Sequence, residues 1–175
     1  MSVHDALMNE LRHAVMRGQK VTLASGEESS TYIDVKGFAL QPRGHSLIGQ
    51  LIMDFVDEEM AVAGVGIGGA TLVSAAITEM MIRQEWVFPL IIRESPKNHG
   101  LHTQIVGSAH SGMNVLLVED VITTGASAVR AVNILRESGY VVEHCYAIVD
   151  RSENFAAHEA LKAVGVSLAS AASLQ

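Results

Sequence analysis

The apolar positions of this chain follow two spacings, one typical of helices and one of buried strands. Leu7, Leu11 and Val15 recur every four residues, which predicts a first helix that ends at Gly18. Further helical patterns cover about 43–60, 70–83, 126–138 and 154–164, and short apolar runs at 61–65, 86–93, 114–118 and 141–150 lie between them. Strands that alternate with helices predict an α/β fold with a central parallel sheet flanked by helices.

Two segments interrupt this alternation. "KVTLASGEESSTYIDV", residues 20–35, reads as two short strands around a Ser-Gly turn. "ESPKNHGLHTQIVGSAHSG", residues 94–112, is a polar stretch longer than most connections, which favours a functional loop. Pro89 within 86–93 indicates a place near a sheet edge or at a strand start.

Composition narrows the class of protein. A length of 175 residues predicts one domain, residues 1–175, and no apolar run approaches the ~20 residues needed to span a bilayer. The charged N-terminus does not resemble a secretory leader, and a single cysteine, Cys145, fits a reducing compartment, so we expect a cytoplasmic protein. The net charge of −7 argues against a nucleic-acid partner but permits a small anionic substrate.

The stretch "VLLVEDVITTGAS", Val115 to Ser127, carries the strongest chemical signal. Its second half lies where a loop enters a helix, so its N–H groups lack partners within the helix and can bind one phosphate. Its two acids, Glu119 and Asp120, suit hydroxyl groups or Mg²⁺ instead. A ribose 5-phosphate satisfies both halves, because its diol and its phosphate lie a few bonds apart.

The whole run resembles the phosphoribosyl-diphosphate (PRPP) signature of type I phosphoribosyltransferases. "LASGEESSTYIDV", "RESPKNHG" and the "DR" of Asp150 and Arg151 narrow the resemblance to orotate phosphoribosyltransferases. It implies the type I fold with a small N-terminal hood, residues 1–40, packed on the core. It also implies transfer of the phosphoribosyl group from PRPP to orotate with Mg²⁺, in a homodimer whose mobile loop, residues 94–107, reaches the neighbouring site.

The resemblance also implies a role for individual residues. Lys97, Glu119 and Asp120 are the expected catalytic residues, and the two acids are the expected metal ligands, either directly or through water. The expected substrate-binding residues are Tyr32, Arg93, His99, Thr123, Thr124, Gly125, Ala126, Ser127 and Arg151. Among these, Thr123 to Ser127 would hold the 5′-phosphate, Lys97 the diphosphate and Arg151 the orotate carboxylate.

Several cations of the family pattern are replaced. Glu94 stands where the mobile loop usually has lysine, Ala24 and Glu27 flank the Ser-Gly turn in place of basic residues, and Gly68 occupies a position where some relatives have lysine. These departures favour a second hypothesis, a PRPP-binding paralogue or regulator without orotate activity. A purine phosphoribosyltransferase fits less well, because "KNHG" and "SGEESSTYIDV" do not suit that branch.

Two further alternatives come from short motifs. Gly64, Gly66 and Gly69 form a G-x-G-x-x-G pattern between a strand and a helix, as in dinucleotide-binding proteins. The spacing to Glu94, near the end of the next strand, is longer than that motif has, and the pattern leaves Val115 to Ser127 unexplained. His99 and His102 could suggest a metal site, yet no third ligand follows at a fixed spacing. No G-x-x-x-x-G-K-[ST] motif occurs, so a P-loop nucleoside triphosphatase is not indicated.

Overall fold

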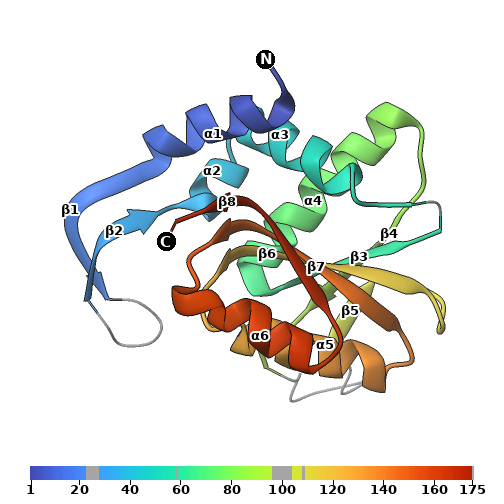
Figure 1. Cartoon of the computed structure of the whole chain (residues 1–175). Helices are drawn as coiled ribbons and strands as arrows, with labels where there is room; N and C mark the ends of the chain where they lie inside the picture. Colours follow the sequence, from blue (N-terminus) through green and yellow to red (C-terminus); the bar gives the residue numbers. More distant parts are fainter. Residues whose placement is uncertain (23–27, 58, 96–103, 108, 175) are drawn as a thin grey trace.

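The computed structural model describes residues 1–22, 28–57, 59–95, 104–107 and 109–174, without the side chains of residues 12–22 and 28–32. Within these ranges the chain forms a six-stranded sheet covered by helices and a separate two-stranded sheet near the N-terminus (Figure 1).

The six-stranded sheet has the order β5-β4-β3-β6-β7-β8. All neighbouring strands are parallel except β5, which runs antiparallel to β4 at one edge. The strands are β3 (Ala61–Val65), β4 (Phe88–Ile92), β5 (Ile105–Gly107), β6 (Asn114–Ile122), β7 (Val141–Asp150) and β8 (Ser167–Ser173). The predicted parallel sheet is confirmed, and Pro89 lies at a strand start. The prediction missed β5, because three residues inside a polar segment carry too short a pattern.

Helices cover both faces of this sheet. Leu116 and Val118 of β6 pack in a core with the first four helices, whereas Val115 and Leu117 pack in a second core with the last two. The helices are α1 (Val3–Ala14), α2 (Val35–Ala39), α3 (Pro42–Met53), α4 (Gly66–Arg83), α5 (Ala126–Glu137) and α6 (Ala156–Ala163), with a 3₁₀ turn η1 (Glu153–Phe155) before α6. Because successive strand residues point to opposite faces, burial on both sides produces the continuous apolar runs seen in the sequence.

The N-terminal segment contains a hairpin and two helices. Strand β1 (Val15–Thr22) pairs antiparallel with β2 (Glu28–Ile33), and both lie apart from the large sheet (Figure 1). The prediction of a helix up to Gly18 was therefore wrong: α1 ends at Ala14, and Val15 pairs with Ile33 instead. An apolar residue at this position fits either period, and the cross-strand partner decides between them.

Other helix boundaries also differ from the prediction. The helix expected to reach residue 60 ends at Met53, and the Phe55 ring packs on Tyr146 at a centroid distance of 4.3 Å. Helix α4 begins at Gly66, earlier than the predicted residue 70, because glycines that look like a loop form its first turn. The predicted first turn of the last helix is the separate η1, whose Asn154 has a left-handed φ of 50°.

Glycines allow α4 to start directly at the end of β3. A Cβ atom on Gly64 would lie 2.5 Å from the backbone oxygen of Gly69, and a Cβ on Gly69 would overlap the Gly64 backbone. Gly66 lies between them with φ +57°, a conformation that favours glycine. The G-x-G-x-x-G pattern is thus accounted for by a sharp strand-to-helix turn.

We expect Gly64→Ala to lower the free energy of unfolding by about 1–3 kcal/mol, because the new methyl group meets backbone that cannot move aside. Urea denaturation of the two proteins measures this difference. Ser74→Ala, on the exposed side of α4, is the control and should change stability by less than about 0.5 kcal/mol. Equal stability of Gly64→Ala and the parent protein would contradict the close packing.

Candidate active site

A cavity of about 480 Å³ lies at the carboxyl ends of β3 and β6. These two strands are neighbours, but β3 connects through α4 to β4 on its other side. The connections therefore diverge between β3 and β6, which is where ligands bind in open α/β sheets. The cavity is lined by Lys36, Val65, Gly68, Ile92, Arg93, Glu94, Gln104, Glu119, Asp120, Val121, Thr123, Ser127, Arg130, Ala131 and Ile134.

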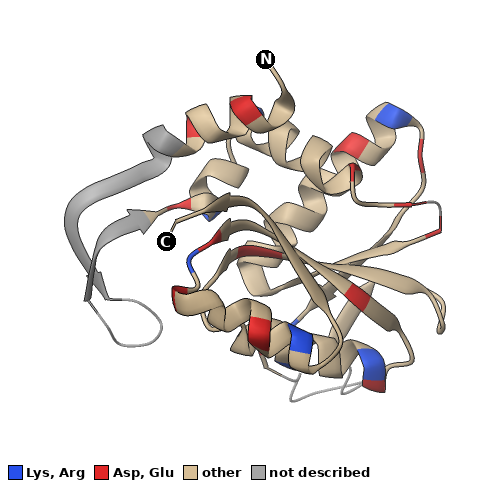
Figure 2. Ribbon diagram, in the orientation of Figure 1, with Lys and Arg blue, Asp and Glu red and all other residues tan. Residues whose placement is uncertain are grey.

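The two central acids lie inside β6, not beyond its end as the sequence suggested. Strand β6 continues to Ile122, so Glu119 and Asp120 are successive strand residues and point to opposite faces of the sheet. Glu119 points toward α5, where Ser127 and Arg130 favour its ionised form. Asp120 points toward the face of α2 and α4. Figure 2 shows acidic positions inside the central sheet, while most basic positions lie on helices and loops.

Glu119 is an acid in an environment that disfavours its charge. The residue is 6% exposed, and its Oε1 atom has no hydrogen-bond partner among the described residues. Burial, followed by the negative charge of Asp120, raises the pKa of Glu119 to about 8, although Ser127, Lys36 and Arg130 act in the opposite direction. A buried polar atom without a partner costs free energy, so the cavity wall offers a strong site for a ligand hydroxyl.

Asp120 has a different environment. Its Oδ2 atom lies 3.4 Å from Nζ of Lys36, and its side chain is 15% exposed. A Cβ atom on Gly68 would lie 2.8 Å from the same carboxyl group, so the absence of a side chain at position 68 lets Asp120 pack against the first turn of α4. This carboxyl group lines the cavity and can therefore reach a ligand there.

The loop after β6 leads to the N-terminus of α5. Thr123 and Thr124 are exposed, and Gly125 is the N-cap residue with φ 77°, a left-handed conformation. A Cβ on Gly125 would also lie 3.1 Å from the backbone of Ala157 in α6, so packing and conformation both require glycine. Since Gly125 has no side chain with which to cap the helix, the first N–H groups of α5 can bind an anion.

The base of the long polar segment borders the same cavity. The backbone N–H of Arg93 donates to the carbonyl of Gln104 at 2.9 Å, and Nε2 of Gln104 donates to the Arg93 carbonyl at 2.8 Å. These two bonds hold residues 93 and 104 side by side. The Glu94 carboxylate lies against Gly66 at the start of α4. The segment expected to move as one loop, residues 94–107, is shorter than predicted, because Ile105–Gly107 form β5.

The structure brings together some of the predicted site residues. Arg93, Glu119, Asp120, Thr123 and Ser127 line the cavity. Thr124, Gly125 and Ala126 form the adjoining turn and helix start.

Arg151 does not line this cavity; its backbone N–H donates to the carbonyl of Ile122 at 2.8 Å at the end of β7. Lys97 and His99, the side chain of Tyr32, and the replaced positions Ala24 and Glu27 lie outside the described residues.

Sequence reasoning missed three polar or charged residues of the cavity lining. Arg130 follows Ser127 by three residues and so lies on the same side of α5, a spacing that could have identified it. Gln104 lay in a segment without a recognisable pattern. Lys36 gave no local signal, because only the packing of α2 beside β6 brings it to Asp120.

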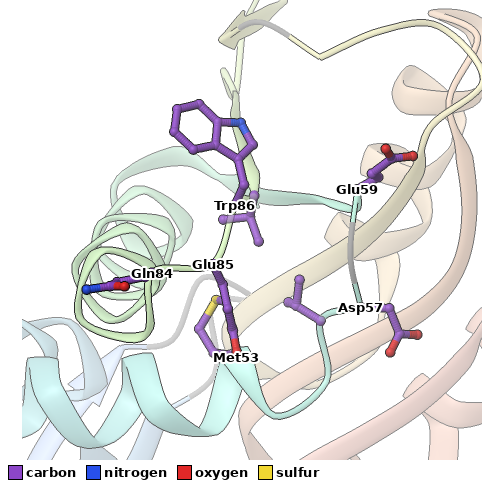
Figure 3. A pocket seen from close by; sticks show the side chains of 8 residues that line it. Met53, Asp57, Glu59, Gln84, Glu85 and Trp86 are labelled. Carbon is purple, nitrogen blue, oxygen red and sulfur yellow. The ribbon is translucent and has the colours of Figure 1, made fainter.

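A second cavity, of about 520 Å³, lies at the amino ends of β3 and β4. It is lined by Met53, Val56, Asp57, Glu59, Gln84, Glu85, Trp86 and Val87. Although it is slightly larger, the carboxylates of Asp57 and Glu59 point away from Trp86 rather than converging on a common point (Figure 3). A small-molecule site needs convergent polar groups, so the cavity at the carboxyl ends is the better candidate.

The described helices include none that is both long and apolar enough to cross a membrane. The described residues likewise hold no group of three or more His, Cys, Asp or Glu side chains arranged for a metal ion. A metal at this site would therefore need ligands from a bound substrate or from water in addition to the carboxylates.

Comparison with known proteins identifies the family. The family model for the phosphoribosyl transferase domain matches residues 39–171. The orotate phosphoribosyltransferase of Sorangium cellulosum is 38% identical over 170 residues, which are 94% of this chain and 88% of that protein. The orotate phosphoribosyltransferase of Methanocaldococcus jannaschii is 36% identical over 155 residues, which are 87% and 85% of the two chains.

A solved structure is similar over almost the whole chain. The Mycobacterium tuberculosis orotate phosphoribosyltransferase in complex with PRPP superposes with a TM-score of 0.78 at 29% identity and covers 99% of this chain and 97% of that one. The central sheet and its helices thus have the type I phosphoribosyltransferase architecture that the sequence predicted. The chain belongs to the phosphoribosyltransferase family and, within it, to the orotate phosphoribosyltransferases.

Proposed function

We propose that this enzyme transfers the 5-phosphoribosyl group of PRPP to orotate, forming orotidine 5′-monophosphate and diphosphate. The proposal rests on one cavity that is shared by Glu119, whose Oε1 atom has no hydrogen-bond partner among the described residues, and by the start of α5. The reaction breaks the bond from the anomeric carbon to the diphosphate oxygen, and the electron pair leaves with diphosphate. A ring nitrogen of orotate, which loses its proton, bonds to the same carbon.

The proposed pose follows from the two ends of the cavity. The 5′-phosphate lies at Thr123 to Ser127, where N–H groups and hydroxyls can donate to it. The ribose hydroxyls lie against Glu119 and Asp120, whose oxygens are acceptors when ionised. This pose directs the anomeric carbon and its diphosphate toward the start of α4 and the base of the 93–104 segment.

Charge development in this reaction explains why basic groups border the cavity. The ribose gains positive character while negative charge grows on the diphosphate, and preorganised cations stabilise the second change. Lys36, Arg93 and Arg130 line the cavity. They supply positive charge although Gly68 and Glu94 do not, which favours turnover over the alternative of a PRPP-binding regulator.

Mg²⁺ is part of the proposal. The orphaned Oε1 atom of Glu119 and the partly exposed carboxylate of Asp120 are hard oxygen ligands of the kind that Mg²⁺ prefers. Mg²⁺ usually takes only one or two carboxylates and completes its shell with substrate phosphates and water, which fits a site with two acids. When bound, the ion would neutralise charge on the diphosphate.

We also propose a homodimer in which residues 94–104 of one subunit reach the neighbouring site. Support comes from the base of this segment, which is fixed beside the cavity by the two Arg93–Gln104 bonds. Lys97 and His99 are the residues proposed to act there, with Lys97 on the diphosphate and His99 on the substrate. Arg151 is retained as a proposed contact of the orotate carboxylate.

A cytoplasmic location is proposed as well. Its support is chemical: the only cysteine, Cys145, is buried and reduced, and burial raises the pKa of its thiol. A chain of this composition needs no oxidising compartment.

Diphosphate release in the presence of PRPP and Mg²⁺ tests the proposed function directly. We expect release with orotate and not with uracil or purines. Asp120→Asn should lower kcat/KM by ~10²–10³ while folding is retained, because a neutral amide cannot replace the carboxylate that binds the ligand. Lys162→Gln, on an exposed position of α6, is the control and should leave kcat/KM unchanged. PRPP binding without diphosphate release would instead identify a regulator.

The raised pKa of Glu119 predicts a pH-dependent stability. Between its ordinary pKa of 4.5 and about 8 the folded state keeps a proton that the unfolded state loses, so stability falls as pH rises through this range. Glu119→Gln removes this loss. The variant should therefore gain stability over the parent protein by up to roughly 4 kcal/mol between about pH 5 and pH 8. Urea denaturation across this range measures the difference, and a pH-independent difference would refute the assignment.

Subunit mixing tests the shared site. Inactive Lys97→Ala and Asp120→Ala proteins should recover part of the activity after exchange, because some mixed dimers contain one site with both residues intact. A mixture of each variant with itself serves as the control. Absence of recovery after subunit exchange has been verified by mass spectrometry would refute donation of the 94–104 segment.

A further inference from the structure

The cavity presents an electrostatic problem for the proposed substrate. Glu94, Glu119 and Asp120 all border it, and a diphosphate carries several negative charges. Position 68 has no side chain, and position 94 is an acid, so neither supplies a cation. The region between α4 and Asp120 therefore needs positive charge from another element.

Lys36 is placed to supply this charge. Its Nζ atom lies 3.4 Å from Oδ2 of Asp120, on the α2 side of the cavity, and its side chain is 52% exposed. An ammonium group is a multiple donor, so one lysine can contact both a carboxylate and a bound anion. The half-exposed side chain is part of the cavity lining and is therefore within reach of a ligand there.

The position of Lys36 is fixed by the short helix that carries it. Oδ1 of Asp34 accepts a hydrogen bond from the N–H of Gly37 at 2.9 Å and so caps α2. Val35 and Phe38 are 1% and 5% exposed and hold α2 in the core next to α4. With Val35 and Phe38 buried, the half-exposed side chain of Lys36 lies at the edge of the cavity.

Gly68 and Lys36 lie on either side of Asp120 in the cavity lining. A Cβ at position 68 would lie 2.8 Å from the carboxyl group of Asp120, and Lys36 contacts the same carboxyl group. Arg130, by contrast, lies on α5 near Glu119 and Ser127, at the end proposed for the 5′-phosphate. The two cations thus belong to different ends of the cavity.

We propose that Lys36 binds the diphosphate group of PRPP and the diphosphate product, and so takes the place of the cations missing at positions 68 and 94. This inference rests on the proposed function for the identity of the substrate. Lys36 selects for the diphosphate end of the ligand, whereas α5 and its preceding loop hold the monophosphate end. Its contact with Asp120 also keeps that acid from repelling the incoming anion.

Isothermal titration calorimetry with two separate probes tests this assignment. Inorganic diphosphate with Mg²⁺ reports on the Lys36 end, and ribose 5-phosphate reports on the α5 end. Loss of one charge-assisted hydrogen bond predicts that Lys36→Gln weakens diphosphate binding by about 10- to 100-fold. Ribose 5-phosphate binding should stay within about twofold, because its proposed contacts are with the start of α5 and with Glu119 and Asp120, all of which remain in the variant. Lys36→Arg should restore most of the diphosphate affinity.

Lys162→Gln, a lysine on the exposed side of α6, is the matched control and should bind both probes like the parent protein. Diphosphate affinity within about twofold of the parent in Lys36→Gln would overturn the proposal, as would an equal loss for both probes, which indicates a structural role. Parent protein that binds diphosphate but forms no nucleotide from PRPP and orotate would refute the proposed function and leave the role of Lys36 in diphosphate binding supported.

Discussion

Two adjacent carboxylates near the end of one buried strand are the constraint on which this site depends. Because strand residues alternate, Glu119 faces α5 and Asp120 faces α2 and α4, so one dipeptide contacts both helical layers. The two environments differ. Burial raises the pKa of Glu119 to about 8, whereas Asp120 lies beside the ammonium group of Lys36. A single pair of acids thus provides two chemically distinct groups.

The backbone of β3 and α4 is the second requirement. Only a sharp turn lets α4 begin close to Asp120, and this turn depends on contact between the backbones at Gly64 and Gly69. The switch point between β3 and β6 then separates the helix starts of α4 and α5 on either side of the acids. A ligand with an anion at each end and hydroxyls between them matches this spacing of groups.

Local patterns in the sequence predicted the parts of this arrangement that depend on neighbouring residues. The apolar runs predicted the buried sheet, and Thr123 to Ser127 predicted the loop and helix start that follow the two acids. Lys36 could not be predicted, since only tertiary packing places α2 beside β6. The predicted end of the first helix was wrong for a related reason. Val15 satisfies the helical period, but it pairs with Ile33, which lies 18 residues further along the chain in β2.

The site also resolves the apparent conflict between carboxylates and a phosphorylated substrate. Two ionised acids at this place would repel a phosphate, yet neither presents a full negative charge to the empty cavity. Burial favours the protonated form of Glu119 at neutral pH, and Lys36 offsets the charge of Asp120. An incoming anion therefore meets little net repulsion, while the oxygens of both acids stay available to ribose hydroxyls. Burial of Glu119 and the cation beside Asp120 thus lower the negative potential at the two acids, and both carboxyl groups keep oxygens that can accept hydrogen bonds.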